Sequence, residues 1–390
     1  MKNLETLIQE LCPDGVEFVK LGDVCKISRG KVYSKKYLAE HIGEYPVYSS
    51  QTANDGILGK IGTYDCDGKF LTWTTDGAYA GTVFYRQGKF SVTNVCGLIS
   101  CSNPILSLKF LYYWLTIEAP KHVHQGMGNP KLMSNQMAKI EIPLPPIEVQ
   151  TEIVRILDKF ISLEAKLEAE LDCRKRQYEY YRDKLLSFDN VGGQEVEWKK
   201  MSEVCEIYDG THQTPKYQSG GIPFISVENI KDIYGSNKYI SLEDYESYKI
   251  KPKVGDVFMT RIGSIGVCAV FTKQADIAYY VSLALLRPNK EILDSRYLKH
   301  FIESAIGRKE LGKRILHNAV PIKINKSDIG KVKLLIPSLE EQHRIVSILD
   351  RFESLTTSLQ SGLPAEIAAR RQQYEHYRDK LLTFKPKGAV

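Results

Sequence analysis

The sequence has no apolar run long enough to cross a bilayer, and its first residues, MKNLETLIQE, lack the apolar core of a secretory signal. A membrane-spanning helix needs about 20 mainly apolar residues. We therefore expect an intracellular, cytoplasmic protein. Of the 390 residues, 43% are hydrophobic and 26% are charged, which is typical of globular proteins and is enough chain for two or more domains with full cores.

Closely paired cysteines are also missing, because the eight thiols are scattered without a CxxC spacing. Disulfide frameworks and zinc sites both need regularly or tightly spaced cysteines. His122 and His124 form an HxH pair, which we interpret as an ordinary loop feature. The sequence therefore predicts reduced, mostly buried thiols, no metal site and no cofactor.

Catalytic signatures are equally scarce. The sequence contains no NPPY-like or DPPY-like amino-methyltransferase motif, no GK[ST] phosphate loop and no HExxH motif. Glu197-Trp198-Lys199 matches the ExK of a nuclease site, but no Pro-Asp pair precedes it at a suitable spacing. The segment 263–266 lacks the full GxGxxG spacing and predicts a turn between strands. We expect no catalysis by this chain.

One long pattern is present twice. Residues 150–188 (QTEIVRILDKF to QYEYYRDKLLSF) and 342–384 (QHRIVSILDRF to QYEHYRDKLLTF) are similar along their whole length. Apolar residues recur in both at steps of three and four, the period of a coiled-coil seam. The seam positions are Ile153, Ile156, Phe160, Leu163, Leu167, Tyr178, Tyr181 and Leu185 in the first copy, and Ile345, Ile348, Phe352, Leu355, Leu359, Tyr374, Tyr377 and Leu381 in the second.

The second copy is four residues longer. Asp158 corresponds to Asp350 at a spacing of 192 residues, whereas Asp183 corresponds to Asp379 at a spacing of 196. Four residues are about one helical turn, so the insertion keeps the seam on nearly the same face. The stretch 361–364 (SGLP) predicts a kink or a short interruption of this second helix.

Helices of this length need a partner. At about 1.5 Å per residue each would extend roughly 55–60 Å, and a narrow apolar stripe on such a helix is not stable alone in water. The sequence supplies a partner in the second copy, so we expect the two helices to pack on each other. The alternative is that each helix packs separately on the surface of its own domain.

The duplication extends beyond the helices. Residues 18–30 align with 198–210, and residues 139–150 align with 331–342. The segments between these anchors differ, which suggests one scaffold that carries two different binding domains. Pro145, Pro146 and Pro337 mark the start of the long helices.

The globular parts read as α+β, with β-rich domains of mixed structure. Short runs rich in Val, Ile, Tyr and Thr are bounded by Gly, Asn and Asp. We expect helices over 4–11, 105–117 and 295–306. The expected strands are 42–50, 69–75, 82–84, 91–100, 222–227, 256–260, 266–271 and 279–286.

The repeated motifs carry a resemblance to a known family. The runs IPLPPIEVQTEIVRILD and IPSLEEQHRIVSILD, with QYEYYRDKLL and QYEHYRDKLL, resemble the specificity (S) subunit of type I restriction-modification systems. The resemblance covers essentially the whole chain and is strongest over the helices. It implies two target recognition domains separated by an antiparallel pair of long helices, with an internal pseudo-twofold repeat. The implied parts are residues 1–147, helix 148–188, residues 189–339, helix 340–384 and a tail at 385–390.

The resemblance also implies the function. Each recognition domain would read one half of a bipartite site in double-stranded DNA, and the helix pair would set the spacer. Two modification subunits with adenine methyltransferase activity and two restriction subunits with ATP-dependent endonuclease activity would be the partners, and this chain would be non-catalytic. The alternatives are a protein-only structural adaptor and a stand-alone nuclease. The formal net charge of +6 is compatible with DNA binding but does not establish it.

Candidate DNA-binding residues lie in glycine-containing or polar loops. Phosphate binding needs cations, and base recognition needs amides, hydroxyls or guanidinium groups. Lys131 and Lys323 correspond at the spacing of 192 and precede the two long helices, so we predict a phosphate contact at both. The full set of candidates is Arg29, Lys31, Ser50, Gln51, Thr74, Asn129 and Lys131 in the first half, and His212, Gln213, Arg261, Lys313, Arg314 and Lys323 in the second.

Two further groups are interpreted as structural. The basic runs 174–176 and 370–371 are more typical of a solvated helix face or a docking surface than of a DNA contact. Trp73 is expected in the core. The tyrosines of the repeated QYE motifs fit the helix seam better than a base-stacking platform.

Overall fold

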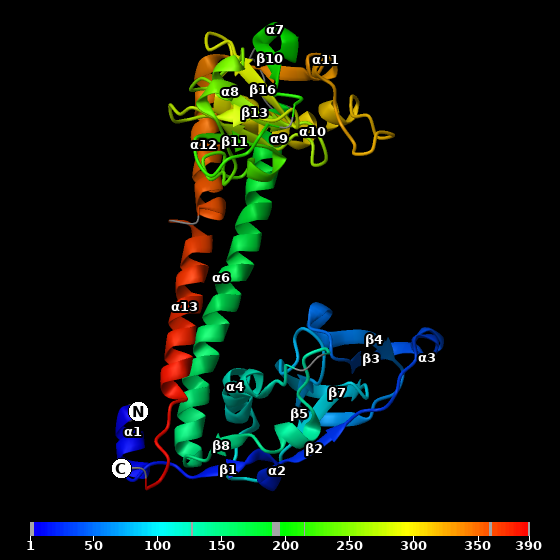
Figure 1. The fold of residues 1–390 in the computed structure, drawn as a ribbon, viewed down its shortest axis with the longest axis vertical. Coiled ribbons are helices and arrows are strands. Elements are labelled where there is room, and N and C mark those ends of the chain that lie inside the picture. The colour runs from blue at the N-terminus through cyan, green and yellow to red at the C-terminus, as the bar shows by residue number, and fades with distance from the viewer. Residues whose placement is uncertain (1–3, 126–127, 189–195, 214, 359–360, 389–390) are drawn as a thin grey trace. The chain divides into compact units, whose positions relative to one another are not determined.

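The computed structural model describes residues 4–125, 128–188, 196–213, 215–358 and 361–388. The chain forms two compact units. Residues 1–166 with 367–390 form the first, which we call unit 1, and residues 167–366 form the second, unit 2 (Figure 1). Within the described residues, no helix is both long enough and apolar enough to span a membrane.

Unit 1 is built around a six-stranded sheet of order β2-β7-β5-β6-β3-β4. Most neighbours are antiparallel, but β3 and β6 pair in parallel, with Val47 opposite Ser91. A separate ribbon of β1 and β8 lies beside the start of the long helix (Figure 1). The elements are α1 (Leu4–Leu11), β1 (Phe18–Lys20), α2 (Leu21–Val24), β2 (Lys26–Arg29), α3 (Lys35–Glu40), β3 (Ile42–Tyr48), β4 (Ile57–Ile61), β5 (Cys66–Thr74), β6 (Val83–Val92), β7 (Cys96–Ser100), α4 (Leu108–Glu118), α5 (Ser134–Met137) and β8 (Glu141–Pro143).

Unit 2 repeats this plan with a divided sheet. Four strands run in the order β10-β16-β13-β14, and three more in the order β12-β11-β15. The parallel pair of β11 and β15, with Phe224 opposite Ala278, takes the place of β3 and β6. The elements are β9 (Glu197–Lys200), α7 (Met201–Val204), β10 (Cys205–Asp209), β11 (Ile222–Ile225), β12 (Tyr239–Ile240), α8 (Leu242–Ser247), β13 (Val257–Thr260), β14 (Cys268–Val270), β15 (Ala278–Tyr279), β16 (Leu283–Pro288), α9 (Ser295–Glu303), α10 (Ala305–Gly312), α11 (Lys326–Ile329) and β17 (Lys333–Ile336).

The long helices are α6 (Ile147–Ser187), α12 (Leu339–Thr357) and α13 (Leu363–Leu381). The predicted interruption of the second long helix is confirmed, because α12 ends at Thr357 and α13 begins at Leu363. Pro364 explains the break, because proline has no N–H to continue a helix. Glycine fits at 362, where a side chain would come within 2.7 Å of the Leu355 carbonyl oxygen.

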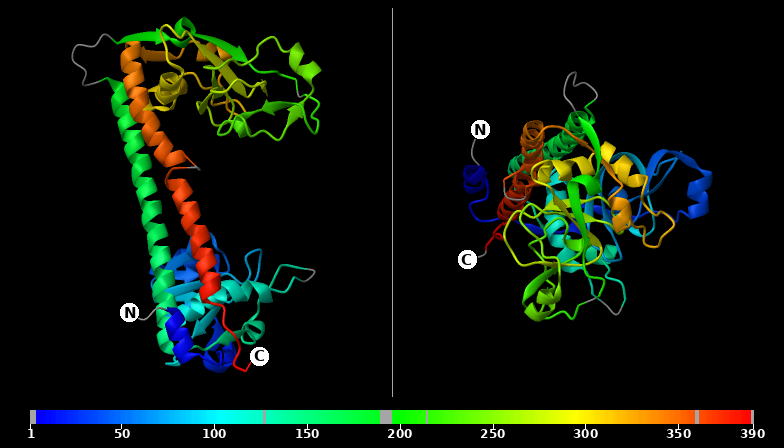
Figure 2. Two further views of the ribbon diagram at one scale, coloured as in Figure 1. Left: turned by 90° about the vertical axis from the view of Figure 1, so that its left-hand side faces the viewer. Right: turned by 90° about the horizontal axis from the view of Figure 1, so that it is seen from above.

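The helices pack on each other within each unit, as the seam predicts. In unit 1 the ring of Phe160 on α6 stacks on Tyr377 of α13 at 5.5 Å, and Glu164 pairs with Arg371 at 2.6 Å. In unit 2 the ring of Tyr181 on α6 stacks on Phe352 of α12 at 5.6 Å. Glu164 comes after Phe160 on α6, whereas its partner Arg371 comes before Tyr377 on α13. The helices therefore run antiparallel. The left view of Figure 2 shows α12 beside the last turns of α6.

Each helix pair is also fixed to its own domain by a buried glutamine. In unit 1 the Nε2 group of Gln150 donates to the carbonyl oxygens of Ile105 at 2.8 Å and Pro145 at 2.7 Å, and its Oε1 accepts the N–H of Ser107 at 2.8 Å. Gln342 repeats all three bonds in unit 2 with Ile292, Pro337 and Asp294. Both glutamines are fully buried.

A second junction lies two turns further along each helix. In unit 1 the Asp158 carboxylate accepts from Tyr113 at 2.5 Å and from Lys109 at 2.7 Å. In unit 2 the equivalent Asp350 contacts His300 at 2.9 Å and Arg296 at 2.6 Å. The geometry is the same while the partners from the domain differ.

The core predictions hold in outline. Trp73 is fully buried in the core of unit 1, together with Leu71 and Phe110 from the domain and Ile153 from α6. The helix predicted over 4–11 has the predicted bounds. The turn predicted over 263–266 lies between β13 and β14.

Three predicted strands are wrong in extent. The segment 82–84 is only the start of β6, which continues to Val92. The segment 91–100 contains the end of β6 and then β7, with a turn that the Cys96 N–H closes on the Thr93 carbonyl at 3.0 Å. The segment 279–286 likewise divides between β15 and β16, because the Leu283 N–H turns back to Tyr280 at 2.9 Å. Valine, tyrosine and leucine favour extended structure on both sides of each turn, so strand propensity alone does not reveal the turn.

The helix predicted over 295–306 is also wrong in extent, since α9 ends at Glu303 and α10 starts at Ala305. Ser304 lies between them with an extended backbone, and its hydroxyl accepts the Gly307 N–H at 3.1 Å. A serine in this role begins a new helix rather than continuing the old one.

Candidate nucleic-acid interface

One edge of each domain is built by a close backbone approach at a glycine. After β2 the chain passes the end of β6, where the Lys31 N–H donates to the Val92 carbonyl at 3.1 Å. A side chain at Gly30 would lie 1.7 Å from that carbonyl oxygen, so only glycine fits. Gly210 in unit 2 has the same role, since its side chain would lie 2.5 Å from the Tyr279 carbonyl oxygen.

A threonine at the end of the central strand organises the next loop in both units. The Thr74 hydroxyl donates to the Tyr79 carbonyl and accepts the Thr82 N–H at 3.1 Å. The Thr260 hydroxyl donates to Ser264 and accepts the Val267 N–H at 3.0 Å. Both threonines are buried, so their hydroxyl groups are used inside the loops.

A hairpin-like loop then joins the same edge. In unit 1 residues 124–131 are closed by two backbone hydrogen bonds between His124 and Lys131, at 2.8 and 3.1 Å, and we call this segment finger 1. In unit 2 the Leu316 N–H bonds to the Lys323 carbonyl at 2.8 Å, and residues 316–323 form finger 2. The fingers lie 192 residues apart, which agrees with the predicted correspondence of Lys131 and Lys323.

The base of each finger is held by the residue that comes directly after β5 in unit 1 or after β13 in unit 2. The Leu132 N–H donates to the Thr75 carbonyl at 2.9 Å in unit 1, and the Ile324 N–H donates to the Arg261 carbonyl at 3.0 Å in unit 2. The positions of Thr75 and Arg261 are thus equivalent. In unit 1 the Thr75 hydroxyl also donates to Val95 at 2.8 Å.

The loops of unit 1 that the sequence selects meet at this edge. Lys31 pairs with Thr93 through the backbone, and Thr93 donates to the Ser49 hydroxyl at 3.2 Å. The backbone of Lys131 forms an isolated β-bridge with the backbone of Asp76, in the loop after β5. The Arg29 guanidinium reaches Ser134 just beyond finger 1 at 3.2 Å. Segments that are far apart in the sequence therefore form one continuous surface.

Unit 2 brings its loops together in the same way. Thr211, which precedes the predicted His212 and Gln213, pairs with Tyr280. The Arg261 N–H donates to the Ser282 carbonyl at 3.0 Å, and the Ser282 hydroxyl accepts the Val227 N–H at 3.3 Å. The backbone of Lys323 forms an isolated β-bridge with the backbone of Ile262.

Most of the candidate side chains are accessible, but two are not. Those that are exposed are Arg29, Lys31, Asn129, Lys131, His212, Gln213, Lys313 and Lys323, and those that are half-buried are Ser50, Gln51 and Arg314. Thr74 is 1% exposed and Arg261 is 7% exposed. In the described conformation these two stabilise loops and present little surface to a ligand.

Arg261 is the clearest difference from the sequence interpretation, which includes it among the candidate DNA contacts. Its guanidinium forms an ion pair with Asp209 and donates through Nε to the Ile324 carbonyl at 3.2 Å. A buried arginine with these partners fixes the base of finger 2. The sequence did not reveal Asp209 as the partner, because Asp209 ends β10 and Arg261 follows β13, 52 residues further along the chain.

Several cations already have partners. Lys31 forms an ion pair with Asp65 at 2.5 Å, and the hydrogen bond to this carboxylate raises the pKa of Lys31. Lys313 pairs with Glu310, and Arg314 donates to the Lys331 carbonyl at 3.3 Å. Gln51 donates to the Ile57 carbonyl at 2.6 Å. An exposed ion pair is worth little, so a phosphate could compete for such lysines.

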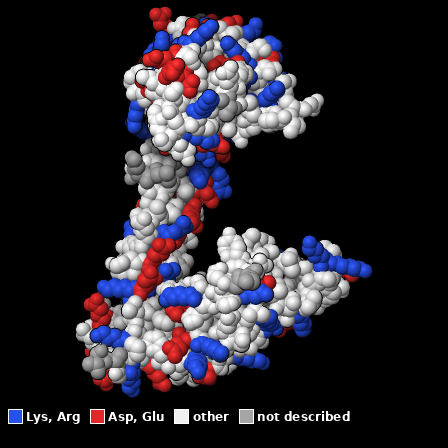
Figure 3. Space-filling view, in the orientation of Figure 1, with Lys and Arg blue, Asp and Glu red and all other residues white. Residues whose placement is uncertain are grey.

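Charges of both signs are interspersed on the face of each unit that Figure 3 draws. Lysine and arginine side chains do not merge there into a single basic stripe. A surface of this kind favours contacts made by individual loops over general attraction of a polyanion.

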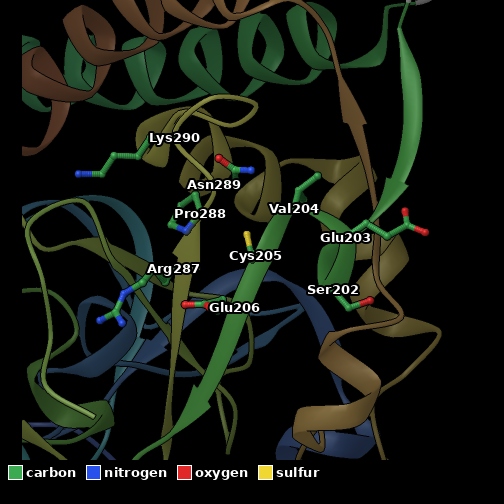
Figure 4. Close-up of a pocket in the computed structure, with 9 residues that line it drawn as sticks. All are labelled: Ser202, Glu203, Val204, Cys205, Glu206, Arg287, Pro288, Asn289 and Lys290. Atoms are coloured by element: carbon green, nitrogen blue, oxygen red, sulfur yellow. The ribbon is translucent and has the colours of Figure 1, made fainter.

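Two other features of unit 2 have the outline of a site. A depression of about 520 Å³ in unit 2 is lined by residues 202–206 and 287–290 (Figure 4). Arg287 is held by Asp256 at 2.7 Å, and burial raises the pKa of the Cys205 thiol, so neither is an available reactive group. His300, Asp350 and Glu353 lie close together, but His300 is satisfied by Tyr178 at 3.1 Å and by Asp350.

Comparison with known proteins identifies the family. The model of the type I restriction modification DNA specificity domain matches residues 13–172 and 194–369. The chain therefore belongs to this family and contains two copies of its domain. The match agrees with the resemblance that the repeated helix motifs carry.

The similar proteins are specificity subunits. A putative type I specificity subunit of Mycoplasma pneumoniae is 31% identical over 366 residues, covering 94% of this chain and 97% of that protein. A putative type I restriction enzyme specificity subunit of Haemophilus influenzae is 31% identical over 411 residues, covering 98% of this chain and all of that protein.

Two solved structures support the fold. The crystal structure of a type I restriction-modification system S subunit from M. genitalium matches with a TM-score of 0.56 at 14% identity, covering 94% of this chain and 96% of that chain. A chain from a structure described as the basis of complex assembly and conformational transition of the type I R-M system matches with a TM-score of 0.61 at 19% identity, covering 95% and 98%. The predicted fold class, with two β-rich domains and long antiparallel helices, is confirmed.

Proposed function

We propose that unit 1 and unit 2 each bind one half of a bipartite site in double-stranded DNA, and that this chain thereby selects the sequence on which a type I restriction-modification complex acts. The supporting observation is the repeated edge. The same glycine approach, threonine-closed loop and finger occur in both units, while the side chains that they present differ. A repeated scaffold with different exposed groups suits two half-sites of different sequence.

The proposed contacts are the accessible residues of these edges. Lys131 and Lys323 bind phosphate at equivalent places, and Arg29, Lys31, Lys313 and Arg314 add further cations. Asn129, Gln51, Ser50, His212 and Gln213 offer hydrogen-bonding groups to base edges. Thr74 and Arg261 support the loops that carry them.

The partners in this proposal are two modification subunits, which methylate adenine, and two restriction subunits, which use ATP and cut DNA. This chain contributes recognition and no catalysis, and it acts in the cytoplasm. The helices set the number of base pairs between the half-sites. The support for these roles is membership of the family and the length of α6.

Methylome sequencing tests the proposal directly. Cells with this chain and its partners should carry adenine methylation at a split motif, and cells that lack the chain should lose it. If the methylation motifs are the same with and without the chain, the proposal fails. Purified chain that cuts duplex DNA with Mg²⁺ alone would favour a nuclease, and a complex without any salt-dependent DNA binding would favour an adaptor.

A change in helix length tests the spacer. Deleting residues 361–364, or inserting four residues near Leu167, should change the gap between the half-sites and leave both half-sites unaltered. One helical turn is about 5.4 Å, which is less than two base pairs at 3.4 Å each. Altered half-sites with an unaltered gap would contradict a spacer role.

A further inference from the structure

Finger 2 has an unusual surface. Val320 at its tip is 100% exposed, and Leu316 and Ile322 on its sides are 40% and 39% exposed. Such apolar groups cost free energy in water unless a partner covers them. Figure 1 shows the loop before α11 extending away from the body of unit 2.

The surroundings of this tip are basic. Lys313 and Arg314 precede the finger, Lys323 closes it, and His317 lies within it. Lys313 pairs with Glu310 and Lys331 pairs with Asp328, whereas Lys323 has no ion pair among the residues that the structure describes. A loop with an apolar tip and cations at its base is complementary to duplex DNA. The phosphates line the grooves of the duplex, and the floor of a groove carries the apolar parts of the bases.

The finger is held firmly at its base. Backbone hydrogen bonds join Ile324 to Arg261 at 3.0 Å and Gly263 to Ile322 at 3.0 Å. The ion pair of the buried Arg261 with the partly exposed Asp209 fixes this anchor. A projection with a fixed base loses less conformational entropy on binding than a mobile loop does.

Finger 1 differs at the equivalent place. The spacing of 192 residues puts Gly128 opposite Val320 and Asn129 opposite Pro321. The described part of finger 1 therefore has no side chain opposite Val320, and it presents a polar amide opposite Pro321. The two fingers are thus suited to different base edges.

On the basis of the proposed function, we propose that Val320 at the tip of finger 2 contacts the apolar part of a base pair, the C5-methyl group of a thymine. In the major groove this methyl group distinguishes a thymine from the other bases. Val320 then determines specificity at one position of the half-site that unit 2 reads. Arg261 acts as a positioning residue for this contact.

The test replaces Val320 with serine in the full complex and sequences the methylome. The motif should relax at one A·T position in one half-site, with about a tenfold loss of preference there, while the other half-site stays the same. Val254→Ser is the matched control, because Val254 is also an exposed valine of unit 2, at 41%, but lies outside the finger. Val320→Ser is not expected to unfold the protein, since this side chain is fully exposed.

A binding assay with synthetic DNA sharpens the test. Replacing the mapped thymine with deoxyuridine removes only the methyl group, and should weaken binding of the unaltered complex by about the factor that Val320→Ser produces. Val320→Ser should then bind both DNAs equally, with an unaltered salt dependence. Lys323→Gln should instead reduce the slope of log K against log salt by about 0.9.

The outcomes separate this inference from the proposed function. If no motif depends on the chain, the proposed function fails. If a motif depends on the chain and Val320→Ser leaves it unaltered, the thymine contact is wrong. If Val320→Ser reduces methylation equally at every site and releases the methyltransferase subunit, the tip binds protein and the inference is overturned.

Discussion

Unit 1 and unit 2 fix their domains to the long helices with the same geometry and partly different chemistry. Gln150 and Gln342 make the same three hydrogen bonds. At the next junction Asp158 binds a tyrosine and a lysine, whereas Asp350 binds a histidine and an arginine. The fully buried glutamine is the same residue in both units, whereas the partly exposed aspartates are bound by different partners.

The loop edges carry this contrast further. Backbone hydrogen bonds, one glycine and one threonine are repeated in both units, so the scaffold is constant. The side chains on the scaffold differ, as with Thr75 and Arg261 or Gly128 and Val320. A protein built in this way can change its ligand in one unit without changing its fold.

The largest expected effect comes from the buried glutamines. Gln342→Leu should destabilise unit 2 by about 3 kcal/mol, because buried carbonyl and N–H groups lose their partners, and Gln150→Leu should do the same to unit 1. Hydrogen exchange, measured residue by residue, should show faster exchange confined to the altered unit. Gln372→Leu, at an exposed position of α13, is the control, and equal effects of one substitution on both units would contradict equivalent, separate junctions.

The next largest effect is on the stability of unit 2 at low pH. Burial alone raises the pKa of Asp350, but the hydrogen bond and charge of His300, together with Arg296, outweigh burial and hold this pKa below its ordinary value. A carboxyl with a lowered pKa stabilises the fold above its unfolded pKa, about 3.9, and this stability disappears as the pH falls through the lower folded value.

Asp350→Asn should therefore cost about 1.5 kcal/mol at neutral pH and flatten the acid dependence of unit 2 below pH of about 4. Denaturant unfolding from pH 7 downward measures both. Asp172→Asn, at an exposed position of α6, should change neither. An unaltered acid profile in Asp350→Asn would show that this junction does not contribute to the acid sensitivity.

The smallest expected effect is a change in the salt dependence of DNA binding when one lysine is altered at either proposed DNA-binding edge. Lys131→Gln and Lys323→Gln should each reduce the slope of log K against log salt by about 0.9, and the double variant should reduce it by twice as much, because each lysine binds one phosphate. Neither variant should alter the half-site sequences. Lys20→Gln and Lys200→Gln are matched controls at equivalent exposed positions of β1 and β9, and an unequal change for Lys131 and Lys323 would show that the two edges bind DNA differently.

The sequence by itself determined the repeated plan. The apolar steps of three and four predicted the helix pair, because a narrow stripe on a long helix needs a partner. The spacing of 192 residues predicted that Lys131 and Lys323 are equivalent, and Pro364 predicted the break between α12 and α13. Only the tertiary structure decided which side chains are exposed at the edge. Arg261 and Asp209 lie far apart in the sequence, and strand pairing brings them together into an ion pair, whereas Val320 remains in solvent because finger 2 extends beyond the strands that hold its base.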